Sequence, residues 1–118
     1  MPEQVTLTFG YNSDDDNKEA TDVCVSVLAR LFGGATVQAP QRGAWIDDTG
    51  KAVYDTVTTI TATKLDGRVD DQEYAALSDL CRQVNGICDQ ECVFLSIVPC
   101  SRAELVYGRP GGQSGQSD

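Results

Sequence analysis

Residues 43–64 read GAWIDDTGKAVYDTVTTITATK and predict a β-hairpin at the centre of a sheet. The only tryptophan, Trp45, precedes a turn at Asp47–Lys51, in which Gly50 can adopt a positive φ. Val53 starts a long return strand that continues through Thr63. Val53 and Val57 lie on one face of that strand, whereas Ile60 and Ala62 lie on the other. This change of face predicts a β-bulge near Thr58 and Thr59.

The flanking segments predict four strands and two helices around this hairpin. Residues 5–9 alternate apolar and polar side chains, as in a half-buried strand, and residues 13–18 read as an acidic loop that enters a helix. Each helix is predicted from an apolar stripe at helical spacing. The first stripe consists of Cys24, Val27, Leu28 and Leu31, and Gly33-Gly34 is expected to end that helix. The second stripe consists of Leu77, Leu80, Cys81, Val84 and Cys88. Asp70 and Glu73 form a capping box, and Gly86 is expected to end the second helix. Short strands are expected at 35–39 and 103–107, and a covered strand at 91–98.

This order predicts a ferredoxin-like α+β fold, βαββαβ, with two helices on one face of an antiparallel sheet. We expect a single domain over residues 1–107 and a disordered tail, rich in Gly, Ser and Gln, over residues 108–118. The opposite sheet face is left open and should carry some of the threonines Thr6, Thr8, Thr56, Thr58, Thr61 and Thr63. Such a face is either solvated, with threonines chosen for strand propensity, or a contact surface for a second subunit or a ligand.

The charge of the chain restricts its partners. Eighteen acidic and nine basic residues give a net charge of −9, which would repel the phosphates of a nucleic acid. The densest acidic segment contains Asp14, Asp15 and Asp16. With Asn12, Asp14 and Asp16 at the first, third and fifth positions, the spacing suggests an EF-hand. Asn17 and Val23, however, occupy the positions of the required glycine and glutamate. The segment therefore either maintains solubility or competes for a basic site on another protein.

Several catalytic chemistries are missing from the sequence. No histidine is present, which excludes Ser-His-Asp triads, Cys-His pairs and conventional zinc enzymes. No phosphate-binding glycine loop is present either. We expect no catalytic residues, no cofactor and no enzyme activity; an enzymatic alternative would need Tyr54, Asp55 or Glu73 as acid or base.

The five cysteines predict reduced thiols. Their number is odd and the N-terminus lacks the features of a secretion signal, so we expect reduced cysteines in a cytoplasmic protein. No apolar run is long enough to span a bilayer, so we expect no membrane segment. Cys88 and Cys92 could meet across a turn, but two thiolates without a histidine do not make a convincing metal site. We expect the cysteines to act as small buried hydrophobic residues.

The candidate binding residues lie around the hairpin. Trp45 offers an aromatic stacking surface, with Tyr54 at the border of the open face. Arg42, Lys51 and Arg68 flank the hairpin and could bind an anion such as a nucleotide phosphate. The alternatives are a tryptophan in the core and basic residues that are simply solvated.

The segments Phe32-Gly33-Gly34-Ala35-Thr36 and Gly43-x-Trp45-x-Asp47, with Gly50 and Val53, resemble short uncharacterised bacterial and phage proteins. Those proteins share a GGAT-like helix end and a Gly-x-Trp hairpin. The resemblance follows the layout of residues 5–107 but is specific only over 32–53. It implies an α+β fold and an origin in a phage or mobile element, and it transfers no catalytic residue.

Two functional hypotheses follow. The first is a non-catalytic homo-oligomer, assembled through the open sheet face, that binds a small anionic ligand or a protein partner near Trp45. The second is an acidic inhibitor that blocks the nucleic-acid-binding surface of a host defence protein, as some phage proteins do.

Overall fold

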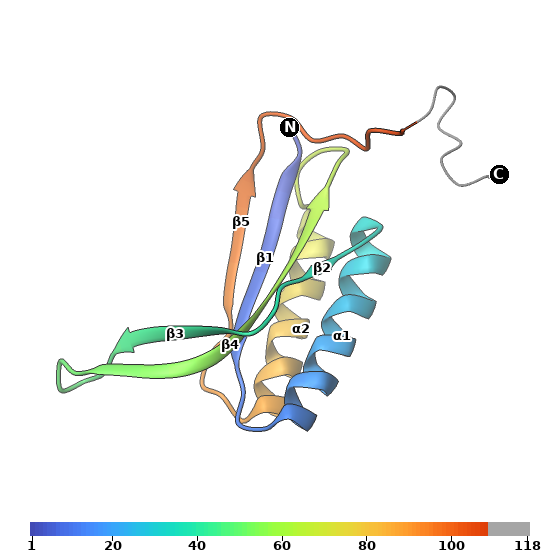
Figure 1. Ribbon diagram of the computed structural model, residues 1–118. Coiled ribbons are helices and arrows are strands. Elements are labelled where there is room, and N and C mark those ends of the chain that lie inside the picture. The colour runs from blue at the N-terminus through green and yellow to red at the C-terminus, as the bar shows by residue number, and fades with distance from the viewer. Residues whose placement is uncertain (109–118) are drawn as a thin grey trace.

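The computed structural model describes residues 1–108 and confirms the predicted fold class (Figure 1). The structure contains the two helices and the antiparallel sheet that the sequence predicts. The prediction of a tail falls almost entirely on residues 109–118, which lie outside the described residues. The elements are β1 (Glu3–Gly10), α1 (Asp14–Phe32), β2 (Thr36–Val37), β3 (Gln41–Ile46), β4 (Ala52–Lys64), α2 (Asp71–Cys88) and β5 (Phe94–Pro99).

The strands are ordered β2-β4-β1-β5, and β3 pairs with the outer half of β4. The register between β1 and β4 is continuous from Glu3–Lys64 to Gly10–Val57, so the predicted bulge in β4 is wrong. The irregularity lies in the segment between β2 and β3, which runs opposite β4. Val37 pairs with Ile60 and Gln41 with Val57, so residues 38–40 oppose only residues 58–59. Pro40, which has no N–H to donate, sits at this point.

The apolar residues of β4 change face because the strand extends past the helices. Ile60 and Ala62 are buried on the face that carries the helices. Before Thr58, over residues 52–57, the strand lies outside the two-layer body. Val53 and Val57 lie on the face opposite to that of Ile60 and Ala62, since side chains alternate along a strand. One continuous strand thus packs against the helices in one half and forms the hairpin in the other. The change of face therefore requires no bulge in β4.

The helix ends differ from the predictions in two places, and one predicted strand does not form. α1 begins at Asp14, within the expected loop, because the Ser13 side chain accepts a 3.1 Å hydrogen bond from the Asp16 N–H. α2 begins at the predicted capping box but continues through Gly86 to Cys88, where Asp89 takes a left-handed conformation with φ 52°. Residues 103–107, predicted as a strand, have no regular structure.

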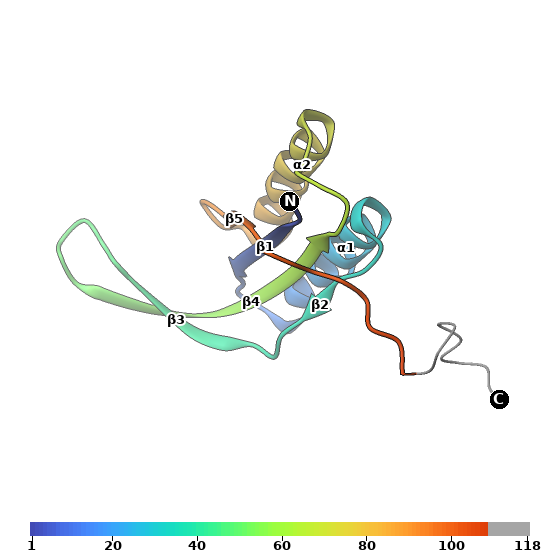
Figure 2. The ribbon, with the colours of Figure 1, turned by 90° about the horizontal axis from the view of Figure 1, so that it is seen from above.

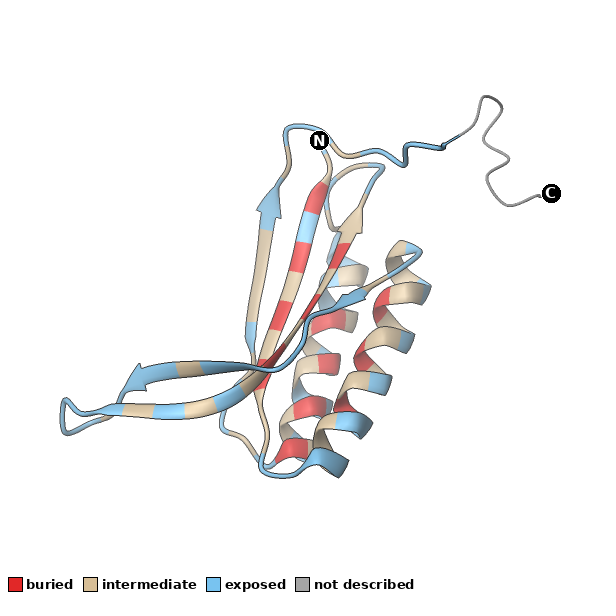
Figure 3. Cartoon of the chain, in the orientation of Figure 1, coloured by how far each residue is buried: buried red, intermediate tan, exposed pale blue. Residues whose placement is uncertain are grey.

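The core lies between the sheet and the two helices, which cover one sheet face only (Figures 2 and 3). Its buried apolar side chains are Val5, Leu7, Phe9, Ile60 and Ala62 from the sheet, Ala20, Cys24 and Leu28 from α1, and Leu77, Leu80, Val84 and Cys88 from α2. Neither of the two helices within residues 1–108 covers the other sheet face or the β3–β4 hairpin. Among the described residues, neither helix combines the length and the hydropathy that a bilayer crossing requires.

Candidate functional site

The open sheet face carries a band of hydroxyl groups. The register places Thr6 beside Thr61 and Ser96, and Thr8 beside Thr59. The Thr8 and Thr59 hydroxyl oxygens are 3.1 Å apart and hydrogen bonded. The face therefore has the predicted threonine-rich character.

Two of the threonines named in the prediction lie elsewhere. Thr58 is buried against α1 and is 1% exposed. Thr56 pairs with Arg42 on the reverse surface of the hairpin. The prediction placed only some of the six on the open face, and alternation along β4 decides which ones they are.

Residues 41–57, which we call the arm, extend from the body as a two-stranded hairpin (Figures 1 and 2). Large side chains on it face solvent: Trp45 is 49% exposed, Tyr54 59% and Ile46 67%. A lone two-stranded hairpin is at best marginally stable in water. The arm therefore presents apolar side chains that the other described residues leave exposed.

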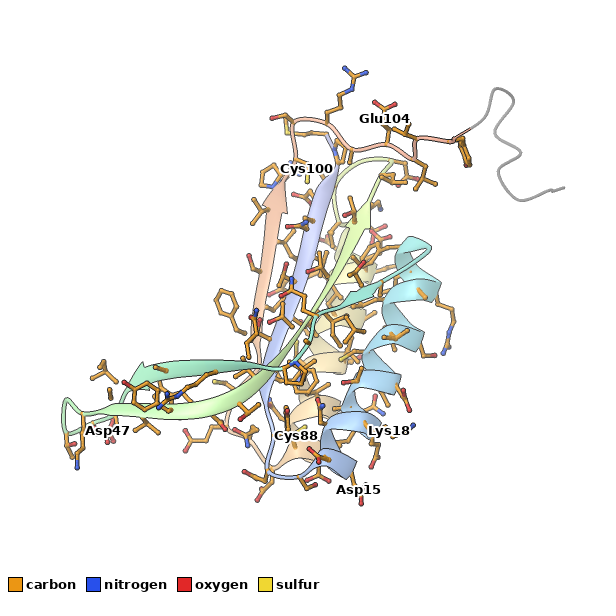
Figure 4. The ribbon with its side chains drawn as sticks, in the orientation of Figure 1. Asp15, Lys18, Asp47, Cys88, Cys100 and Glu104 are labelled. Atoms are coloured by element: carbon orange, nitrogen blue, oxygen red, sulfur yellow. The ribbon has the colours of Figure 1, made fainter. Side chains whose placement is uncertain are left out.

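The tip of the arm is held by the Asp47 side chain (Figure 4). One carboxylate oxygen accepts hydrogen bonds from the Thr49 N–H at 2.9 Å, the Thr49 hydroxyl at 2.6 Å and the Lys51 N–H at 3.0 Å. The hydrogen bond from the Thr49 hydroxyl is the largest of the effects that lower the pKa of Asp47. Gly50 has φ 81°, as the predicted turn requires.

The structure brings together only part of the predicted binding set. The Arg42 guanidinium lies 4.0 Å from the centre of the Tyr54 ring, a cation–π contact. Trp45, which pairs with Val53, lies on the opposite surface of the arm, the one continuous with the open face. Lys51 follows the turn at the tip.

Arg68 is not part of this group. It follows the far end of β4, a strand of 13 residues. At about 3.3 Å per residue, that strand separates Arg68 from the arm tip by about 40 Å. The three basic residues of the predicted anion site therefore do not converge in one chain.

A carboxylate that the sequence did not single out for binding lies at the root of the arm. Asp55 pairs with Gly43 on β3, and its Oδ2 lies so close to Gly10 of β1 that a Cβ built there would be 2.5 Å away. The Gln90 Oε1 lies 3.2 Å from the same built position. Glycines thus flank Asp55 on both neighbouring strands. No sequence pattern links Gly10, Asp55 and Gln90. The pairing of β1 with β4 brings Gly10 near Asp55, and Gln90 lies outside the strands, just after the end of α2.

A groove of about 700 Å³ opens at the other end of the sheet. The GGAT segment noted in the sequence forms one wall, and Ala103–Leu105, which includes Glu104, forms another (Figure 4). Open-face side chains Gln4, Thr61 and Thr63 contribute to its lining. A volume of this size falls in the usual range for small-molecule sites.

The acidic segment forms the first turn of α1 (Figure 4). Asp14 and Asp15 are exposed, and Asp16 is half-buried. Carboxylates at this position stabilise the positive end of the helix dipole. Lys18 is paired within the helix, with its Nζ 3.0 Å from Asp22.

All five cysteines are free thiols. Cys24 and Cys88 are buried as predicted, whereas Cys92 is exposed. Burial is the largest cause that raises the pKa of Cys24, to about 12. Within residues 1–108, no group of three or more Cys, Asp or Glu side chains is arranged to hold a metal ion.

No family model matches the chain, and no curated protein sequence resembles it significantly. Solved structures do resemble it. A phage SAM lyase in complex with S-methyl-5'-thioadenosine is 18% identical, with 81% of this chain and 79% of that one covered and a TM-score of 0.59. The divalent cation tolerance protein CutA1 from Thermus thermophilus is 14% identical, with 88% of both chains covered and a TM-score of 0.57. A periplasmic CutA from Archaeoglobus fulgidus is 12% identical, with 88% of both chains covered and a TM-score of 0.59. At these identities the matches establish the fold alone.

These matches correct one prediction. The expectation that the chain is not an enzyme is contradicted by the SAM lyase, which uses the same fold over about four fifths of each chain. The absence of histidine excludes imidazole chemistry and not catalysis as such. Since one neighbour is described as periplasmic, the cytoplasmic location stays a prediction.

Proposed function

We propose that the chain forms a homo-oligomer that binds S-adenosylmethionine and cleaves the bond between its sulfonium sulfur and its amino-acid chain. The sulfur keeps the electron pair of that bond and leaves as S-methyl-5'-thioadenosine, and the carboxylate oxygen of the same substrate bonds to the vacated carbon to give a lactone. The observation that carries the proposal is the uncovered open face with its arm. The ligand is suggested by two fold matches to phage SAM lyase, one with S-methyl-5'-thioadenosine and one in the apo state, at 18% and 20% identity.

The oligomer is supported by apolar side chains that share the open surface. Trp45 lies on it through the arm, and Phe94 and Val98 through β5, where they pair with Thr8 and Gln4. Phe94 is 65% exposed and Val98 51%. Exposed apolar residues gathered on one face mark interaction sites in soluble proteins. A second copy would cover them and give the arm the packing that it lacks within one chain.

The chemistry of the same surface suits an adenosine ligand. Aromatic side chains provide a platform for a planar base. Threonine hydroxyls and the Gln4 side chain can exchange hydrogen bonds with a ribose. Asp55 provides a negative charge beside them.

Two measurements test the proposal. Native mass spectrometry should give a mass that is a multiple of the chain mass of 12.7 kDa. Chromatography of a mixture of the protein with S-adenosylmethionine should show S-methyl-5'-thioadenosine above the uncatalysed background. A strict monomer would overturn the assembly, and a mixture without product would overturn the activity.

A matched pair of variants locates the contact. Trp45→Lys places a charge on the open surface, and Ile46→Lys places one on the reverse surface of the same strand, where the side chain is at least as exposed. We expect Trp45→Lys to shift the mass toward the monomer far more than Ile46→Lys. Equal effects of the two variants would contradict assembly through the open face.

A second candidate is the acidic inhibitor of a nucleic-acid-binding protein. The exposed carboxylates of Asp14 and Asp15 at the start of α1 favour it, because a basic partner can reach them. A pull-down with basic nucleic-acid-binding proteins at low and high salt tests it. Capture that does not weaken as the salt concentration rises would contradict this candidate.

A further inference from the structure

Asp55 lies in a gap that two glycines create on the open surface. Gly43 pairs directly with it on β3, and Gly10 lies beside it on β1. Because neither neighbour has a side chain, the Asp55 carboxylate has room on both sides. Gly43 is itself confined, since a Cβ there would be 3.2 Å from Val57 Cγ1.

Two hydrogen-bond acceptors meet in this gap. The Asp55 Oδ1 accepts from the Thr56 N–H at 2.8 Å, which leaves Oδ2 facing Gly10. The Gln90 Nε2 donates to the Cys88 carbonyl at 3.3 Å, so the Gln90 Oε1 faces the same point. Neither acceptor can donate to the other when Asp55 is ionised. An arrangement of this kind is satisfied by a donor or a cation from outside the chain.

The described basic residues do not supply that cation. Four ion pairs occur within residues 1–108, and Asp55 takes part in none of them. Arg42 projects from the reverse surface of the arm, where it stacks on Tyr54. Trp45, in contrast, shares the Asp55 surface and is its diagonal neighbour across β3 and β4, about 7–8 Å away. An indole face attracts cations.

We infer that Asp55, with Gln90 and Trp45, binds the positively charged part of the ligand, the sulfonium or ammonium group of S-adenosylmethionine. The inference rests on the proposed function and assigns its charge recognition to one carboxylate. S-Methyl-5'-thioadenosine carries neither cation. The site therefore distinguishes the two molecules by charge, so that the neutral thioether is held less tightly after cleavage.

Binding can be followed with the protein's own fluorescence, because Trp45 is its only tryptophan. Stopped-flow mixing with S-adenosylmethionine or with S-methyl-5'-thioadenosine gives the affinity for each before any turnover. For Asp55→Asn we expect about a tenfold or greater loss of affinity for S-adenosylmethionine, as charge-assisted contacts are lost. The affinity for S-methyl-5'-thioadenosine should change less than about twofold. The control Asp48→Asn removes an exposed carboxylate at the arm tip and should change neither.

A second variant keeps the charge and moves it. In Gly10→Ala the new methyl group would lie 2.5 Å from Asp55 Oδ2 and must displace the carboxylate. We expect the same selective loss for S-adenosylmethionine, with an unchanged circular dichroism spectrum and an unchanged native mass.

Each outcome separates this inference from the proposed function. If Asp55→Asn binds both molecules as wild type does, or weakens both equally, the charge site is wrong while the proposed function stands. If Asp55→Asn dissociates the oligomer, Asp55 meets a donor of a second copy instead, and the inference is overturned. If the wild-type protein binds neither molecule, the proposed function and this inference both fail.

Discussion

The Thr58 hydroxyl donates a 2.7 Å hydrogen bond to the side-chain oxygen of Asn17, which links β4 to α1 at the point where the arm leaves the body. Thr58 is 1% exposed, so this polar contact lies inside the protein. The Asn17 oxygen also accepts from the Thr21 hydroxyl at 3.3 Å. The contact ties the first buried, helix-facing position of β4 to α1, directly beside the arm.

Replacement of Thr58 by valine tests this link. The substitution keeps the shape of the side chain and removes the hydrogen bond, so we expect a loss of about 1 kcal/mol in the free energy of unfolding. Urea denaturation measures it. Thr56→Val, at an exposed position two residues along the same strand, should change stability by less than about 0.5 kcal/mol. Equal losses of stability in the two variants would show that the Thr58 hydrogen bond does not account for the effect of Thr58→Val.

Thr58 also shows where prediction from the sequence succeeded and where it failed. The element order, the capping box at Asp70 and the turn at Gly50 follow from local patterns, and the structure has all three. The change of face along β4 was visible too, but its cause was not. A bulge in β4 and an arm that outruns the helices give the same pattern of apolar residues, and only the pairing with β1 distinguishes them.

The candidate site was less accessible to prediction for a similar reason. Trp45 and Tyr54 stood out as aromatic residues, and the structure places them on opposite surfaces of the arm. Gly10 and Asp55 are 45 positions apart along the sequence. Their approach depends on the register of β1 against β4, for which no single segment carries a signal.

The end of α1 gives a second prediction. Gly33 has φ 93° and donates its N–H to the Ala29 carbonyl, the left-handed cap at which the GGAT segment begins. Gly33→Ala should cost about 1 kcal/mol, because a side chain is strained in this conformation. Gly34→Ala is the control, since Gly34 has no positive φ and a Cβ there would meet nothing within 4 Å. Thermal unfolding of both variants separates backbone strain from helix propensity, and a Gly34→Ala variant as unstable as Gly33→Ala would contradict the assignment.

The acidic start of α1 gives a third prediction. Changing Asp14, Asp15 and Asp16 together to asparagine removes carboxylates that interact with the helix dipole. We expect a loss of about 0.3–1 kcal/mol per exposed carboxylate at low ionic strength, and a smaller loss at about 1 M salt. Urea denaturation at both salt concentrations measures the difference. A triple variant with wild-type stability at low salt would show that the dipole interaction is not the role of these residues, which would strengthen the second functional candidate.

Buried Cys24 gives the fourth prediction, a loss of stability at alkaline pH. Burial raises its pKa in the folded protein from 9.0 to about 12, and the nearby Cys81 and Cys88 thiols act in the same direction. The folded state thus keeps the proton that the unfolded chain releases above pH 9. The contribution of this protonated thiol to the free energy of unfolding is complete below pH 9 and is lost as the pH rises toward 12. Over that range the free energy of unfolding falls by up to about 1.4 kcal/mol per pH unit because of this group.

Denaturation curves at several pH values check this loss. The free energy of unfolding obtained from these curves should fall more steeply with pH for the wild type than for Cys24→Ala, which has no thiol at this position. Thiol labelling at about pH 8 provides an independent check, since exposed Cys92 should react at once and Cys24 only as fast as the protein opens. Rapid labelling of Cys24 in the folded protein, or identical pH slopes for the two proteins, would contradict the burial of this thiol.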